Sequence, residues 1–212
     1  MLEKYHKIET LFERDTETKK LIENKFRNQT VEYLKDNKWE FTEKIDGTNI
    51  RIYWDGHHVT FHGRTDNAQL PAELTNKLFE LFGGETNEQI FEQKFGELEV
   101  TLFGEGYGAK IQNGGNYSPT QEFILFDVTI NNSFLDRENV KQIAEYFNLK
   151  VVPTIMVGTL KEAINYVKTK PKSMIGTADS EGLVGRPLQE LNGRNGERVI
   201  VKIKVRDFCK EK

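Results

Sequence analysis

The sequence predicts an α+β fold in which antiparallel sheets are flanked by helices. Stretches in which apolar and polar residues alternate recur along the chain, and stretches with helically spaced apolar residues lie between them. The 212 residues are 37% hydrophobic and 30% charged, and no repeat or change of composition marks a second large domain. We therefore expect one globular domain over residues 1–212.

The first third of the chain is expected to form a helix and then three strands. Helically spaced apolar residues predict a helix over 16–35. Alternation predicts strands over 39–45 and 49–54, and Asp55-Gly56 is typical of a hairpin turn that leads to a third strand with Val59 and Phe61.

The middle of the chain is expected to form two helices and a strand. Pro71 precedes a helix that Gly83-Gly84 closes, and Thr86 with Gln89 predicts a capping box for the next helix. A strand near 97–105 is expected to end in a glycine-rich stretch, Gly104–Gly108. The glycine spacing is wrong for a dinucleotide-binding turn, and no amphipathic helix follows at once, so we reject that alternative.

The remaining elements follow from the same criteria. They are a buried strand over 123–130, a helix capped by Asp136, a strand over 151–155, a helix whose capping box joins Thr159 and Glu162, and strands over 181–186 and 198–206.

Charge and composition exclude several classes of protein. The net charge of −3 excludes a globally basic nucleic-acid coat, so a polynucleotide must be met by a local basic patch. No apolar run is long enough to span a bilayer and the N-terminus does not look like a signal peptide, so we expect no membrane association. Cys209 is the only cysteine, which excludes an internal disulfide and fits a cytoplasmic protein.

Three lysines lie on the polar faces of expected strands. Lys44 ends a strand next to the Gly47 turn, on the face opposite Phe41, and could be either a nucleophile or an ordinary solvated lysine. Lys202 and Lys204 project the same way from one strand, an arrangement that is costly unless an anion lies near them. The pair therefore suggests a phosphate site, and the alternative is a solvated strand face.

Two carboxylates lie at strand ends beside glycines. Glu105 lies within Gly104–Gly108, and Glu181 precedes Gly182. Carboxylates in such places can bind Mg²⁺, which prefers oxygen ligands and shares them with substrate phosphates. The alternative is that each is a simple strand-end residue.

Taken in chain order, these segments resemble the motifs of the covalent nucleotidyltransferase superfamily, which contains polynucleotide ligases and mRNA capping enzymes. The order is Lys-x-Asp-Gly at 44–47, an arginine, a strand-end glutamate, Phe126-Asp127, Glu181-Gly182 and Lys-x-Lys at 202–204. The match runs from about residue 39 to 206. Within the superfamily, Glu43–Asn49 and the opening Lys4–Glu9 are most similar to the RNA-ligase-2-like branch of the ATP-dependent RNA ligases.

The resemblance implies an adenylyltransferase domain with a nucleotide cleft between its sheets, and an ATP-dependent RNA ligase activity. In such an enzyme, Lys44 attacks the α-phosphate of ATP and forms a lysyl-AMP intermediate with the help of Mg²⁺ or Mn²⁺. AMP then passes to an RNA 5′-phosphate, and a 3′-hydroxyl displaces it. The expected partners are RNA ends, with a nicked duplex or an RNA/DNA hybrid left open, and the expected state is a monomer.

The resemblance also implies roles for the other site residues. Glu43 would accept a hydrogen bond from the adenine amino group, and Phe126 would stack on the purine. Arg64 would touch the phosphates or the RNA end, Asn49 would hold metal-bound water or the ribose-phosphate, and Glu105 and Glu181 would bind the ribose and metal. Lys202 and Lys204 would neutralise charge on the α-phosphate and the leaving group.

Three alternatives remain open. A GTP-dependent capping guanylyltransferase and a minimal DNA ligase share these motifs, but both families normally add an OB-fold after the Lys-x-Lys strand. Only eight residues follow Lys204, so we expect neither an OB-fold nor a separate C-terminal domain. A non-catalytic RNA-binding domain that kept the fold is the third alternative, and the intact Lys44, Glu181 and Lys-x-Lys pair argue against it.

Overall fold

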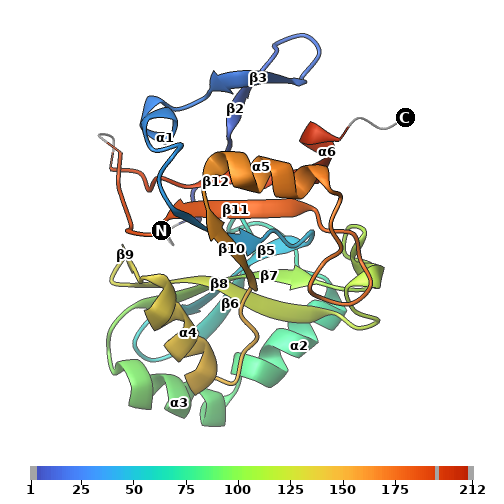
Figure 1. The fold of residues 1–212 in the computed structure, drawn as a ribbon. Helices are drawn as coiled ribbons and strands as arrows, with labels where there is room; N and C mark the ends of the chain where they lie inside the picture. The colour runs from blue at the N-terminus through green and yellow to red at the C-terminus, as the bar shows by residue number, and fades with distance from the viewer. Residues whose placement is uncertain (1–3, 194–195, 210–212) are drawn as a thin grey trace. The chain divides into compact units, whose positions relative to one another are not determined.

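The computed structural model describes residues 4–193 and 196–209, and its internal contacts divide the chain into two compact units (Figure 1). One unit comprises the described residues up to His6 together with Asp46–Val152. The other comprises Lys7–Ile45 and the described residues from Pro153 onward. Each unit contains its own five-stranded sheet and its own hydrophobic core.

The unit that begins at Lys7 is built on a sheet in which all but one strand pair is antiparallel. Its strands, in spatial order, are β1 (Glu9–Thr10), β12 (Val201–Lys204), β11 (Gly182–Pro187), β4 (Trp39–Glu43) and β10 (Thr154–Gly158), with β1 and β12 parallel. Helix α5 (Leu160–Lys168) lies along one face of this sheet (Figure 1). Trp39, Phe41 and Ile203 are fully buried in the core of this face, so the alternate residues of the same strands point to the opposite face.

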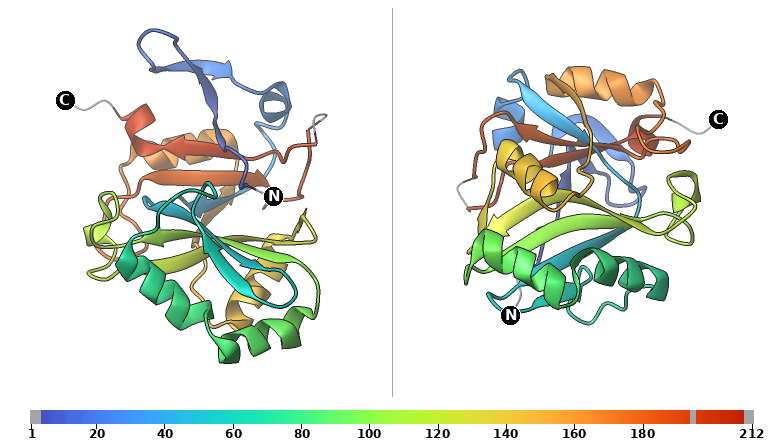
Figure 2. Two further views of the ribbon diagram at one scale, coloured as in Figure 1. Left: turned by 180° about the vertical axis from the view of Figure 1, so that it is seen from behind. Right: turned by 90° about the horizontal axis from the view of Figure 1, so that it is seen from below.

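The unit that contains Asp46–Val152 is built on a wholly antiparallel sheet. Its strands, in spatial order, are β6 (Val59–His62), β5 (Thr48–Trp54), β7 (Val100–Tyr107), β8 (Glu122–Ile130) and β9 (Ser133–Phe134). One face packs on helices α2 (Ala72–Phe82), α3 (Glu85–Phe95) and α4 (Arg137–Tyr146), which Figure 2 shows on the same side of the sheet. A short 3₁₀ turn, η1 (Gly114–Asn116), lies between β7 and β8. The mixed architecture confirms the predicted α+β class.

The helix predicted over 16–35 is wrong. The chain instead forms a hairpin of β2 (Phe12–Arg14) and β3 (Leu21–Phe26), followed by the short helix α1 (Gln29–Tyr33). The Asp15 carboxylate accepts hydrogen bonds from the backbone N–H groups of Glu17 and Thr18 and closes a turn between the two strands. The rings of Phe12 and Phe26 then pack 5.0 Å apart across the hairpin, and this tertiary contact outweighs helix propensity.

The prediction that the strand near 97–105 ends at the glycines is also wrong, because β7 continues through Gly104 and Gly106 to Tyr107. A Cβ on Gly104 would lie 2.2 Å from the Phe123 ring, so this glycine allows a neighbouring ring to lie on the sheet. The chain leaves the sheet at Gly108, whose φ of +109° favours glycine.

Three further boundaries differ from the predictions. The last strand begins at Val201 and ends at Lys204, which pairs with Gly182 at the end of β11, and α6 (Val205–Phe208) follows directly. The strand predicted over 151–155 begins instead at Thr154, while Val151 forms a bridge to Leu125 within the unit that contains both residues. Helix α3 begins at Glu85 after Gly84 without a side-chain cap, so the capping box predicted at Thr86 is absent.

Other local predictions are confirmed. Asp136 caps α4 by accepting from the N–H of Asn139 at 2.8 Å. Thr159 and Glu162 form the expected capping box of α5. Gly56 turns the Asp55-Gly56 hairpin with a φ of +97°. Within residues 4–193 and 196–209, no helix combines the length and apolarity that crossing a membrane requires.

The two predicted caps provide a test of these helix starts. Replacing Asp136 with Ala should lower the free energy of unfolding by about 1 kcal/mol, because the N–H of Asn139 loses its acceptor. Replacing Thr86 with Ala should leave the stability unchanged or slightly raised, because alanine is the better helix former and no cap is lost. Urea unfolding of both variants measures the difference, and equal losses would contradict the helix starts described here.

Candidate active site

Lys44 is held at the end of β4, where three strands lie side by side. Its backbone N–H donates to the carbonyl oxygen of Gly182 at 2.9 Å, and Gly182 is in turn the register partner of Lys204 on β12. Two lysines therefore flank one glycine across three adjacent strands. Because Glu43 and Phe41 point toward α5, Lys44 points to the opposite face, as the alternation predicts.

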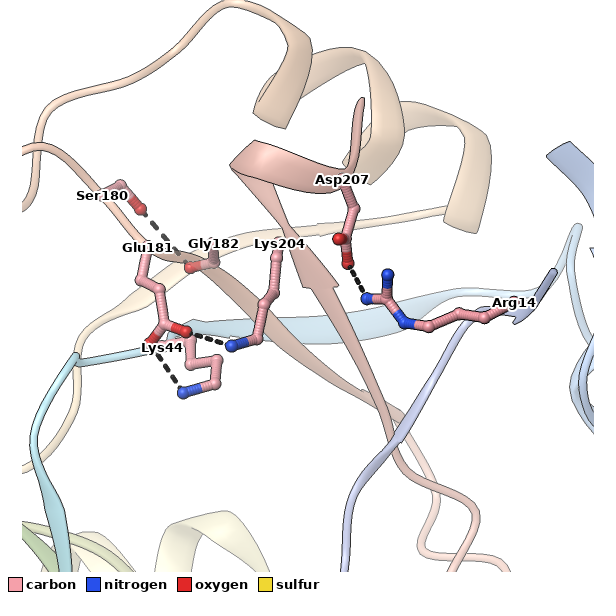
Figure 3. A network of polar contacts seen from close by, with 7 residues as sticks. All are labelled: Arg14, Lys44, Ser180, Glu181, Gly182, Lys204 and Asp207. Carbon is pink, nitrogen blue, oxygen red and sulfur yellow. Dashed lines mark hydrogen bonds and ion pairs between the residues drawn. The ribbon is translucent and has the colours of Figure 1, made fainter. Parts of the chain in front are cut away.

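A single carboxylate connects the two lysines. Lys44 Nζ lies 2.7 Å from Glu181 Oε2, and Lys204 Nζ lies 2.5 Å from Glu181 Oε1, as Figure 3 shows. The three side chains are only 24%, 16% and 14% exposed in the order Lys44, Glu181, Lys204. Each carboxylate oxygen has its own ammonium donor, so the cluster keeps one excess positive charge.

The local electrostatics follow from this arrangement. Burial alone would raise the pKa of Glu181, but the charges and hydrogen bonds of Lys44 and Lys204 outweigh it and lower the pKa below its ordinary value. The pKa of Lys202 is lowered by burial and then by the positive charges of Lys204 and Lys44. Lys202 therefore belongs to the same cationic cluster, and bringing a nearby anion to this cluster would relieve the repulsion.

Glycine is required at position 182 for two reasons. Its φ is +148°, and a Cβ there would lie 2.1 Å from the carbonyl oxygen of Ile203. The backbone on either side is also held, since Val205 N–H donates to the Glu181 carbonyl at 2.9 Å and Ser180 N–H donates to Pro171 at 3.0 Å. These contacts fix the backbone from which the Glu181 carboxylate reaches the lysines.

The side chain of Glu43 is not brought together with Lys44. It is 2% exposed on the α5 face, where Oε2 accepts from the backbone N–H of Met174 at 2.9 Å. Burial and the Glu43 charge raise the pKa of Tyr166 on α5, which places the two side chains near one another. Oε1 is buried without a hydrogen-bond partner among the described residues. The predicted contact of Glu43 with adenine stays a prediction. The observed partner of its carboxylate is Met174, in the segment 171–180.

In the other unit, the predicted residues Asn49 and Glu105 lie opposite each other on β5 and β7, on the sheet face away from the helices. Asn49 Oδ1 is buried and has no hydrogen-bond partner in the described part of the chain. An amide oxygen beside a carboxylate suits a hydroxyl group or a hard cation. Gly47 permits the close approach here, because a Cβ would lie 2.2 Å from the Gly106 carbonyl oxygen.

Phe126 is the extra residue of a β-bulge, because Phe103 pairs with Asp127 whereas Gly104 pairs with Leu125. The bulge brings two successive side chains to one partner, Tyr5. The rings of Tyr5 and Phe126 lie 5.0 Å apart, and Tyr5 Oη donates to Asp127 Oδ2 at 2.6 Å.

Arg137 binds the same bulge. Its Nη1 donates to the Phe126 carbonyl oxygen at 2.9 Å. Sequence reasoning assigned no role to Tyr5, Asp127 or Arg137, although the opening Lys4–Glu9 that contains Tyr5 was part of the resemblance.

The structure thus brings Lys44, Glu181, Lys202 and Lys204 together in one unit, and it places Asn49, Glu105, Phe126 and Arg64 in the other. Arg64 is exposed in the connection that follows β6. Among the described residues, no group of three or more His, Cys, Asp or Glu side chains is arranged to hold a metal ion.

Comparison with known proteins decides the family. The model of the RNA ligase family matches residues 37–204, which is most of the chain. This chain belongs to the RNA ligase family. No curated protein matches it.

Several solved structures of a Naegleria gruberi RNA ligase share the fold of this RNA ligase family member. The structure with PPi has a TM-score of 0.63 and 22% identity, and the match covers 93% of this chain and 59% of that one. The structure of a mutant with ATP and Mn has a TM-score of 0.64 and 21% identity, and the match again covers 93% of this chain and 59% of that one. The structure of an apo mutant has a TM-score of 0.64 and 20% identity, and the match covers 83% of this chain and 51% of that one. The chain therefore spans between half and three-fifths of the length of these structures.

The Glu181 cluster makes stability depend on pH in a defined direction. Folding lowers the pKa of Glu181 from its ordinary value of 4.5. The Glu181 carboxylate therefore stabilises the fold fully above pH 4.5, and this stabilisation is lost as the pH falls through the lower pKa of the folded state. Replacing Glu181 with Gln should lower the free energy of unfolding by about 2 kcal/mol at pH 7, because two part-buried ammonium groups lose their counter-charge. The loss should shrink on acidification toward pH 3.

Urea unfolding of both proteins from pH 7 to pH 3 measures this difference. Glu13→Gln is the matched control, because Glu13 pairs with Lys25 at 2.6 Å where both side chains are well exposed. That variant should cost less than about 1 kcal/mol at any pH. A Glu181→Gln effect that did not change with pH would contradict the described role of the carboxylate.

Proposed function

We propose that this chain is an ATP-dependent RNA ligase that joins a 3′-hydroxyl to a 5′-phosphate through AMP carried on Lys44. The observation that supports it best is the amine of Lys44, held 2.7 Å from Glu181 inside a cluster of lysines, in a member of the RNA ligase family. A nucleophilic lysine needs a group that holds its amine in place and cations that accept phosphate charge, and this cluster supplies both.

In the proposed first step, the Nζ of Lys44 attacks the α-phosphorus of ATP. A phosphorus–nitrogen bond forms, the bond to the β-phosphate breaks, and pyrophosphate leaves with the electron pair. Lys44 must first lose a proton to solvent, and Glu181 Oε2 holds the amine through a hydrogen bond of 2.7 Å. The lowered pKa of Glu181 keeps this side chain a carboxylate at neutral pH, so it orients the amine and does not retain the proton.

Lys202 and Lys204 are proposed to bind the phosphates. The pKa of Lys202 is lowered by burial and by its two lysine neighbours, so this cluster carries repulsion before substrate arrives. A polyphosphate would relieve that repulsion and would place its charge against cations that are already in position. Preorganised charge of this kind costs no rearrangement during the reaction.

Phe126, Asn49, Glu105 and Arg64 are proposed to bind the nucleoside, the metal and the nucleic acid. The Phe126 ring is oriented by the bulge and by Tyr5, which supports stacking on the purine. Asn49 Oδ1 and the neighbouring Glu105 supply oxygen donors that suit the ribose or Mg²⁺. The Naegleria enzyme was solved with ATP and Mn, which supports Mg²⁺ or Mn²⁺ as the metal here. A bound divalent ion would neutralise phosphate charge.

The later steps are proposed from family membership. AMP passes from Lys44 to an RNA 5′-phosphate, and a 3′-hydroxyl then attacks that phosphate and expels AMP. We propose that the two units act together as one adenylyltransferase over residues 37–204 and that RNA ends, including those of a nicked duplex, are the substrates. Cys209 as the only cysteine supports action in the cytoplasm.

Covalent labelling tests the proposal. Incubation with α-labelled ATP and Mg²⁺, followed by denaturing electrophoresis, should label the protein, and Lys44→Ala should abolish the label because the acceptor nitrogen is gone. Lys38→Ala is the matched control, because that lysine is 60% exposed in the same unit and should label normally. Unlabelled wild-type protein would overturn the proposal, and labelling by GTP in place of ATP would favour a capping-type guanylyltransferase.

Nucleotide preference tests the role of Glu43. Because its carboxylate faces α5 and binds Met174, Glu43→Gln should keep an acceptor there and should change the ATP-over-GTP preference by no more than roughly two-fold. A carboxylate that accepted from the adenine amino group would behave differently, since Gln can also donate to the guanine carbonyl. A shift of about ten-fold or more toward GTP in the labelling assay would support the predicted contact of Glu43 with adenine.

A further inference from the structure

Arg51 is an arginine that the strand pattern does not explain. It lies on β5 on the face away from the helices, yet its side chain is 0% exposed. A buried guanidinium is costly unless its N–H groups are bonded and its charge is balanced. The partners of Arg51 therefore indicate what this position is for.

Two hydrogen bonds of Arg51 lead to one short segment. Its Nε donates to the carbonyl oxygen of Gly63 at 2.8 Å, and its Nη2 donates to Asp66 Oδ1 at 2.8 Å. Arg51 is also the register partner of His62, the last residue of β6. The planar fork of the guanidinium thus binds both ends of the segment Gly63–Asp66, directly where β6 ends.

The same segment is held from its other side. Gly63 is buried, and a Cβ on it would lie 2.7 Å from the Cβ of Ala68. Ala68 N–H donates to the Thr65 carbonyl at 3.1 Å and closes a turn. Only Arg64, between these fixed points, extends an exposed cation. The position of its backbone therefore depends on Arg51.

Two exposed cations lie in this region, Arg64 on the segment itself and Lys4, whose charge also lowers the pKa of Asp66. The hydrogen bond from Arg51, more than its charge, lowers the pKa of Asp66, so this residue remains a carboxylate that balances Arg51. Burial, and then the charge of Arg51, lower the pKa of His62, so its imidazole is neutral at pH 7. The Arg51 charge is thus balanced within the protein, while that of Arg64 faces solvent.

We propose that Arg51 is a positioning residue that fixes the Gly63–Asp66 segment so that Arg64 meets the phosphate of the RNA end. The inference rests on the proposed RNA ligase function. Arg51 does not contact the substrate and acts through Arg64, with Asp66 as the counter-charge that keeps its fork in place. A displacement of about 1 Å in a substrate-binding group can lower a rate by roughly 100-fold, so such a clamp has measurable consequences.

A double-mutant cycle between Asp66→Asn and Arg64→Ala tests the proposal. Asp66→Asn keeps an oxygen that can accept from Arg51 Nη2 but removes the counter-charge, so a lower Tm is expected, and thermal unfolding must show that the variant is folded at the assay temperature. Sealing of a pre-adenylylated RNA strand in a nicked duplex should fall about 100-fold for Arg64→Ala and about 10-fold for Asp66→Asn. The double variant should match Arg64→Ala within about two-fold, because the clamp has nothing left to position.

A second variant and a control complete the design. Arg51→Lys keeps the positive charge but loses the planar guanidinium that makes two hydrogen bonds. It should lower sealing as Asp66→Asn does, both in the wild-type protein and in the Arg64→Ala variant. Asp55→Asn is the matched control, because Asp55 accepts from the N–H groups of His57 and His58 in the other turn of the β5–β6 region and should seal normally. If the Arg64 and Asp66 losses multiply in the double variant, or if Asp66→Asn seals normally, the positioning role is wrong.

A binding measurement separates this proposal from the proposed function. Fluorescence anisotropy of a labelled nicked RNA duplex should show weaker binding for Arg64→Ala and for Asp66→Asn, with no further loss when the two are combined. If the wild-type protein were not labelled by ATP, the ligase function would fail even if this binding cycle held. If labelling and sealing occurred but the cycle were additive, only the role of Arg51 would fail.

Discussion

The arrangement of this protein depends on one carboxylate placed between two lysines. Glu181 accepts from Lys44 through one oxygen and from Lys204 through the other, and the three side chains come from adjacent strands of one sheet. The contact is possible because Gly182 adopts a conformation that other residues avoid and carries no Cβ. The amine of Lys44 is thereby held beside a carboxylate and within a cluster of lysines.

In each unit, the two faces of the sheet differ in the same way. One face packs on helices and forms the core, while the other presents polar side chains from alternate positions of the same strands. Ile203 and Lys204 illustrate this in one unit, and Ile50 and Asn49 illustrate it in the other. Local departures from regular geometry adjust the polar faces, as with the β-bulge that brings Phe126 and Asp127 to Tyr5.

The errors of sequence reasoning have physical causes. The apolar spacing over 16–35 suggests a helix, yet Asp15 closes a turn there and Phe12 packs on Phe26 across a hairpin. Gly104 and Gly106 suggest a loop, yet they lie within β7, where Phe123 and Leu74 occupy the space that a Cβ would need. In both cases a packing contact with a residue distant in the sequence outweighs the local preference.

The sequence by itself determined the α+β class, most of the strands that carry the candidate site residues, and the family, because periodicity and motif order are properties of the chain alone. It also identified Lys44, Glu181 and the Lys202–Lys204 pair. Only the tertiary structure decided that both lysine amines share one carboxylate, that the Glu43 side chain faces α5, and that Arg51 is buried under the segment that carries Arg64. Such contacts join residues far apart in the chain, and their geometry depends on strand register and packing, which no local pattern encodes.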